Sequence, residues 1–213
     1  MRRTLFVILI VLCTYTVAWA QPRLQQPEIY VGAQGGVLAS MMQFSPKVAQ
    51  SALHPYLGTN AGLVFRYAGH KYCALQLELN YMQRGWYETD TDYSRRLDYL
   101  ELPFLTHIYF GKRYRGFINL GPQIGVMVHE EGKNEPAEGK PQYLAVDRRF
   151  DWGIAAGIGF YARTVAGTWQ IEARFNYSFG TVFDNRKADY FDNSNPMNLS
   201  LNFAYLWQIK GEK

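Results

Sequence analysis

The sequence contains little that could support a disulfide framework or a helical membrane span. It has 2 cysteines among 213 residues, Cys13 and Cys73. We expect the N-terminal segment that carries Cys13 to be removed, so Cys73 would have no partner and no disulfide scaffold is predicted. Beyond that segment, no apolar run approaches the ~20 residues that a helical span needs. If the chain crosses a membrane, it must use strands closed into a barrel, because open sheet edges cannot lie in lipid.

An excess of one charge is also lacking. The chain has 22 Lys and Arg residues against 18 Asp and Glu residues. Loss of Arg2 and Arg3 with the N-terminal segment would reduce the formal net charge from +4 to about +2. No basic patch indicates a nucleic-acid partner.

Residues 1–20 have the pattern of a secretory signal peptide. Arg2 and Arg3 precede a mostly apolar run from Leu5 to Val17, and small residues then flank Trp19. This pattern predicts cleavage between Ala20 and Gln21, with a barrel domain over residues 21–213. The alternative is a membrane-anchoring helix, which the short run disfavours.

Eight segments alternate apolar and polar residues, as strands with two different faces do. They are about Glu28–Ala39, Asn60–Tyr67, Cys73–Arg84, Leu97–Phe110, Gly116–Val128, Phe150–Ala162, Thr168–Phe179 and Asn198–Ile209. The links between them alternate long and short, which is typical of outer-membrane barrels with short periplasmic turns and longer extracellular loops. The sequence therefore predicts an all-β, eight-stranded antiparallel up-and-down transmembrane barrel. Both termini would be periplasmic and the long loops extracellular.

The size of the side chains indicates which face of each strand points inward. Leu75, Leu77 and Leu79 alternate with Gln76, Glu78 and Asn80. An eight-stranded barrel has an interior just wide enough for side chains to fill, so the bulkier apolar face should point to lipid. This volume limit disfavours the alternative of a soluble ligand-binding barrel, whose interior would be apolar.

A polar network is predicted to fill the bore, because buried charges need partners. Its members are Arg66, Gln76, Glu78, Asn80, Glu101, Gln170, Glu172 and Arg174. We expect Arg66 to pair with Glu78, since their strands are neighbours. A structural plug is favoured over a polar pathway for ions or protons.

Aromatic residues are abundant, with 16 Tyr, 13 Phe and 5 Trp. Clusters at both ends of the predicted strands indicate two girdles at the membrane–water boundaries. The predicted girdle residues are Trp86, Tyr109, Trp152, Trp169, Tyr205 and Trp207.

The segment "YLELPFL" at Tyr99–Leu105 resembles a block of the Bacteroidota outer-membrane β-barrel proteins of the PorT-like or porin family. The segments "VGAQGG", "LQLELNYMQRG", "INLGPQIGVMV", "DWGIAAGIGF" and "IEARFNYSFG" are similar to that family too. The resemblance implies an outer-membrane barrel. The member that names the family is implicated in assembling a secretion system, but no residue here carries that role over.

No residue pattern indicates catalysis, a metal or a cofactor. The chain lacks a G-x-S-x-G motif, and Ser178, near the outer rim, has no histidine close in sequence. His54, His70, His107 and His129 lack metal-site spacing. We therefore expect a non-enzymatic barrel for envelope structure or surface interaction, with outer-membrane lipid and an envelope protein as its expected partners. The alternatives are an accessory or assembly subunit of a secretion or transport machine, and a lipid-modifying enzyme.

Overall fold

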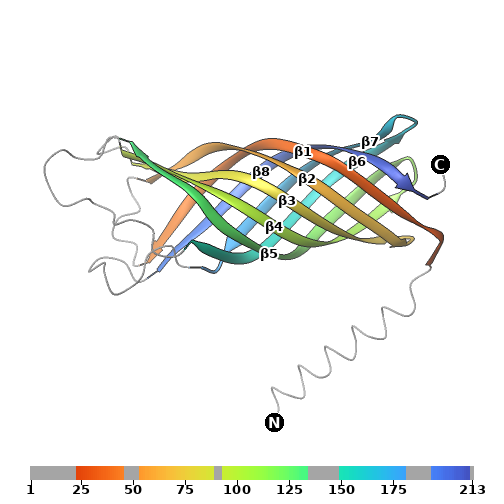
Figure 1. Ribbon diagram of the computed structural model, residues 1–213, viewed down its shortest axis with the longest axis horizontal. Helices are drawn as coiled ribbons and strands as arrows, with labels where there is room; N and C mark the ends of the chain where they lie inside the picture. The colour runs from red at the N-terminus through yellow and green to blue at the C-terminus, as the bar shows by residue number, and fades with distance from the viewer. Residues whose placement is uncertain (1–22, 46–52, 89–92, 134–148, 181–192, 212–213) are drawn as a thin grey trace, which may run out of the picture.

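The computed structural model describes residues 23–45, 53–88, 93–133, 149–180 and 193–211. These residues form eight strands: β1 (Arg23–Ser45), β2 (Leu53–His70), β3 (Cys73–Glu88), β4 (Tyr93–Gly111), β5 (Tyr114–Lys133), β6 (Phe150–Thr164), β7 (Gly167–Ser178) and β8 (Asn193–Lys210). Each strand pairs antiparallel with the next, and β8 pairs with β1, so the sheet closes into a barrel of tilted strands (Figure 1). The predicted all-β, eight-stranded up-and-down barrel is confirmed. Within the described residues, no helix is long and apolar enough to cross a membrane.

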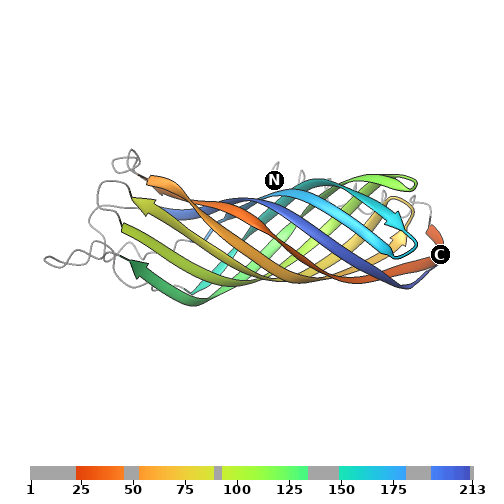
Figure 2. The same cartoon turned by 90° about the horizontal axis from the view of Figure 1, so that it is seen from above.

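The two ends of the barrel differ. At the turn end, residues 71–72, 112–113 and 165–166 connect β2 to β3, β4 to β5 and β6 to β7. Gly111 and Gly167 have φ angles of +116° and +151° there, which L side chains rarely adopt. β8 also finishes at the turn end (Figure 2). The opposite end is the loop end, and its four links, over residues 46–52, 89–92, 134–148 and 181–192, lie outside the described residues.

Several strands continue further toward the loop end than the sequence predicted. β1 ends at Ser45, β2 begins at Leu53, and β5 ends at Lys133 rather than near Val128. The pairing of Ser94 with Lys133 shows that the ladder continues there. In β5, residues 129–133 are polar, charged or glycine, so the sequence there no longer alternates although the backbone still pairs. The links outside the described residues are correspondingly shorter than the predicted loops.

The apolar face of the strands points out and the polar face points in. Leu75, Leu77 and Leu79 are 37–46% exposed, whereas the polar residues that alternate with them on β3 are at most 4% exposed. The same alternation runs along β6 and β7. The interior of the barrel therefore holds the candidate functional site.

Candidate functional site

An ion pair crosses the middle of the bore. Both terminal nitrogens of Arg174 on β7 contact the carboxylate of Glu78 on β3, at 2.5 and 2.7 Å. Four strand positions separate β3 from β7 in the closed order of eight, so the two residues come from opposite walls. Arg174 also donates to both oxygens of Glu172, at 2.9 and 2.8 Å. One guanidinium thus joins two buried carboxylates across the full width of the barrel.

Side-chain amides complete the hydrogen bonding of both carboxylates. Gln34, Gln76 and Asn80 donate to Glu78 at 2.7, 2.5 and 2.8 Å. Asn119 and Gln170 donate to Glu172 at 3.0 and 3.2 Å. Buried charge is tolerated where it is paired and hydrogen-bonded in this way. These residues and Arg174 form the central layer of the bore.

The predicted pairing of Arg66 with Glu78 is wrong. Arg66 donates from Nε to Gln76 at 2.7 Å and from a terminal nitrogen to Gln170 at 2.5 Å. The register explains the difference, because Arg66 lies opposite Gln76 while Glu78 lies opposite Val64. Arg66 is therefore linked to the carboxylates through amides, and its guanidinium lies 5.5 Å from the ring centre of Tyr161.

A second charged layer lies nearer the loop end, around the buried Arg84. Arg84 forms an ion pair with Glu101 and another with Asp151 at 2.8 Å. The Ser178 hydroxyl donates to Asp151 at 2.6 Å. Sequence reasoning placed Glu101 in the bore but missed its partner. Arg84 follows Gln76, Glu78 and Asn80 at the same alternation, and that signal could have identified it.

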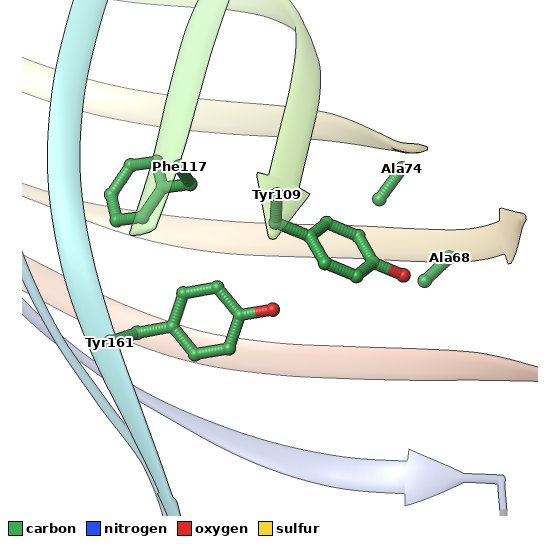
Figure 3. Packing of buried hydrophobic residues seen from close by; sticks show 5 residues of the cluster. All are labelled: Ala68, Ala74, Tyr109, Phe117 and Tyr161. Atoms are coloured by element: carbon green, nitrogen blue, oxygen red, sulfur yellow. The ribbon is translucent and has the colours of Figure 1, made fainter. Parts of the chain in front are cut away.

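Aromatic rings occupy the bore near the turn end, although the sequence predicted a bore filled by a polar network (Figure 3). Tyr109, Phe117 and Tyr161 come from three neighbouring strands and turn toward one another. Ring centres of Phe117 and Tyr161 are 5.9 Å apart, and those of His107 and Phe117 are 4.8 Å apart. His107 Nδ1 lies 2.7 Å from the Asn119 side-chain oxygen, which connects this aromatic layer to the central layer.

Two of the predicted girdle residues are wrong, because their side chains lie inside the barrel. Trp86 is 0% exposed and Tyr109 is 4% exposed. Trp86 has the same alternation as Glu78, and Tyr109 has the same alternation as Glu101, so both must point into the bore. The position of a ring at a strand end suggests a boundary residue, but the alternation of the strand decides where the ring points.

The other predicted girdle residues lie on the outer surface. Trp152, Trp169 and Trp207 are 53%, 44% and 58% exposed. Tyr205 is half-buried between Trp169 and Trp207, with ring centres 4.4 and 4.7 Å away. The predicted cleavage residues Ala20 and Gln21 lie outside the described residues.

Small residues in the wall make room for the charged layers. Gly157 is paired with Arg174 across the β6–β7 ladder. A Cβ at Gly157 would collide with the Oε1 atom of Glu172. Four hydrogen bonds to the two oxygens of this carboxylate hold it in place. The glycine-rich β6 therefore accommodates the network.

Among the described residues, no group of three or more His, Cys, Asp or Glu side chains could hold a metal ion.

Comparison with known proteins places the chain among outer-membrane barrels. Residues 19–184 match the sequence profile of the family described as "Outer membrane protein beta-barrel domain". No curated protein matches the chain. Three solved structures illustrate what the chain is similar to, and at their low identities the similarity concerns the fold alone.

The outer membrane protein OprG of Pseudomonas aeruginosa is 13% identical, with 88% of this chain and 98% of that chain covered and a TM-score of 0.49. Outer Membrane Protein W of E. coli is 14% identical, with 88% and 100% covered and a TM-score of 0.44. The attachment invasion locus protein Ail of Yersinia pestis, solved with sucrose octasulfate, is 13% identical, with 84% and 99% covered and a TM-score of 0.45.

Proposed function

The chain belongs to the family of outer membrane protein beta-barrel domains, and from that premise we propose that it is a small, non-enzymatic barrel with a closed bore. Its role would be envelope structure or surface interaction rather than transport. The rigid wall would hold the loop-end links in place, since loops on a rigid scaffold commonly carry binding functions.

The observation that carries this proposal is the ion pair from Arg174 to Glu78 across the bore. An ion that passed through the middle of the bore would have to displace this contact and leave buried charges without their partners, which is energetically costly. The layer around Arg84 and the aromatic layer lie on either side of it along the strands. Three successive layers of side chains thus occupy the interior.

We also propose an orientation in which the turn end faces the periplasm and the loop end faces the outside. Short turns at one end and longer links at the other support this orientation, because outer-membrane barrels have it. Cleavage after Ala20 would leave the mature N-terminus in the periplasm. The segment at Tyr99–Leu105 supports a place in the PorT-like branch of Bacteroidota barrels.

The burial and hydrogen bonding of Ser178, the serine near the outer rim, support a non-enzymatic role. The Ser178 hydroxyl is fully buried, donates to Asp151, and lies 3.3 Å from a terminal nitrogen of Arg84. A nucleophile needs a neighbouring base and access to substrate. Ser178 instead forms part of the layer that fills the bore.

Planar bilayer recordings test the closed bore. The purified barrel should show no ion steps above leak, while a large porin in the same bilayers should conduct. A triple variant, Glu78→Ala, Glu172→Ala and Arg174→Ala, removes the central contact and is expected to conduct more than the unchanged barrel. Regular steps from the unchanged protein would overturn the proposal and favour an ion pathway.

A further inference from the structure

The turn end carries an excess of positive charge that the rest of the barrel does not share. Among the residues whose side chains the structure describes, six cations lie at this end: Lys71, Lys112, Arg113, Arg115, Arg163 and Lys210. Glu28 is the one acidic residue at this end among the described residues. Toward the loop end, by contrast, Arg84, Arg95 and Arg96 each form an ion pair with a carboxylate.

The single acid at the turn end already has its partners. Glu28 pairs with Arg163 at 3.2 Å and accepts a hydrogen bond from the Tyr30 hydroxyl at 2.8 Å. Arg115 is half-buried, donates to the Tyr161 hydroxyl at 3.2 Å and lies 4.9 Å from the ring centre of Tyr109.

Four exposed cations remain at the rim: Lys71, Lys112, Arg113 and Lys210. Within the described part of the chain, none of these four forms an ion pair with a carboxylate. Among the described residues, no carboxylate therefore neutralises the charge of these four rim cations.

The rim cations lie at the level of the membrane boundary. Lys112 and Arg113 stand between Phe110 and Tyr114, which are 59% and 73% exposed on the outer surface. The Lys71 ammonium lies 5.4 Å from the ring centre of Tyr72. Outward aromatics of a barrel sit at headgroup depth, so cations beside them reach the lipid phosphates.

A hollow of about 840 Å³ joins the charged rim to the lipid-facing surface. One part of its lining is charged, with Lys112 and Arg113 beside the ion pair of Arg163 with Glu28, and another part is apolar, with Val165 and Trp207. Trp207 belongs to the outer face, where it is 58% exposed. A site with both kinds of wall suits an amphiphile whose anionic head and apolar chain start close together.

We propose that the turn end binds anionic phospholipid, with the headgroup phosphate between Lys112 and Arg113. The positive charge alone would also suit an acidic protein, but the apolar lining beside the outward Trp207 favours a ligand that carries an apolar chain. The rim cations also lie on three turns or strand ends around the barrel, as a surrounding leaflet would require. That this leaflet faces the periplasm rests on the orientation under the proposed function, whereas the binding chemistry does not.

Nanodiscs that contain both phosphatidylglycerol and phosphatidylcholine provide the test. The share of each lipid that stays bound to the barrel is measured by native mass spectrometry after detergent release. The unchanged barrel should retain phosphatidylglycerol in preference, and added salt should weaken that preference. The variant Lys71→Gln, Lys112→Gln and Arg113→Gln should lower it by about tenfold or more, because each cation near a lipid surface contributes strongly.

A matched control removes three positive charges from the loop end, through Arg96→Gln, Lys133→Gln and Arg149→Gln. This control should keep the preference, and heat-dependent gel mobility should show that both variants are folded. No preference in the unchanged barrel, or an equal loss in both variants, would overturn the proposal. Binding of soluble polyglutamate without any lipid preference would also overturn it and indicate an acidic protein partner. Both leaflets of a nanodisc are accessible, so the result depends neither on the cellular orientation nor on the closed bore.

Discussion

At the scale of single residues, Arg174 holds the bore together. Its guanidinium donates to both oxygens of Glu78 and both oxygens of Glu172. Burying three charges carries a large desolvation cost, which the attraction between them repays only while every member is present. Removing one acid leaves Arg174 with a partner, whereas removing Arg174 leaves two buried carboxylates without a cation.

We therefore expect Arg174→Leu to lower the free energy of unfolding by about 3–5 kcal/mol, the usual cost of breaking a buried ion pair. The neutral combination Glu78→Gln, Glu172→Gln and Arg174→Met should recover most of this loss, because no uncompensated charge remains. Urea unfolding in lipid vesicles, followed by tryptophan fluorescence, measures both values. Equal stability of Arg174→Leu and the unchanged barrel would show that this contact does not hold the walls together.

At the scale of strands, the alternation of the sequence was sufficient to predict eight strands and their faces. It also predicted most turn-side boundaries closely, whereas β1 begins at Arg23 rather than at Glu28. The alternation was insufficient for assigning aromatic residues at strand ends and for locating the ends of strands that extend toward the loop end. Trp86 and Tyr109 follow the inward alternation, although aromatic residues at strand ends are typical of girdles. The polar end of β5, residues 129–133, does not alternate, so the pattern gave no sign that the strand continues to Lys133.

The side-chain contacts across the bore could not be predicted from the sequence either. Alternation shows that Arg66, Glu78 and Arg174 point inward, but not which of them meet. That depends on the tilt and stagger of the strands, which a closed barrel fixes as a whole. Glu78 consequently contacts Arg174 from the opposite wall rather than Arg66 from the neighbouring strand.

The corrected side-chain directions give a spectroscopic prediction. In variants that retain one tryptophan and carry Phe at the other tryptophan positions, brominated lipid chains should quench Trp207 strongly and Trp86 little. The reason is that Trp207 is exposed on the outer face while Trp86 is enclosed in the bore. Trp169 serves as a second outward control. Comparable quenching of Trp86 and Trp207 would mean that the end of β3 is turned the other way.

At the scale of the whole molecule, the barrel reverses the usual distribution of polarity. Large apolar side chains cover the outer face along every strand, while the interior holds two charged layers with their amide partners and an aromatic layer near the turn end. Soluble monomers rarely expose apolar patches above a few hundred Å², because such surfaces drive association. The closed sheet satisfies the backbone without water, so this surface is compatible with hydrocarbon and incompatible with buffer.

The expected result is that the folded mature chain, from Gln21 onward, stays monomeric only in the presence of an amphiphile. Removal of detergent should produce aggregates, whereas transfer into nanodiscs should preserve the monomer and its β-sheet circular dichroism. Size-exclusion chromatography with light scattering distinguishes these states. A folded monomer in plain buffer would require the apolar side chains to face inward, and the bore with its charged layers could then not exist. The closed bore and the lipid-binding rim both depend on the outward direction of Leu75, Leu77 and Leu79, so this measurement should precede the others.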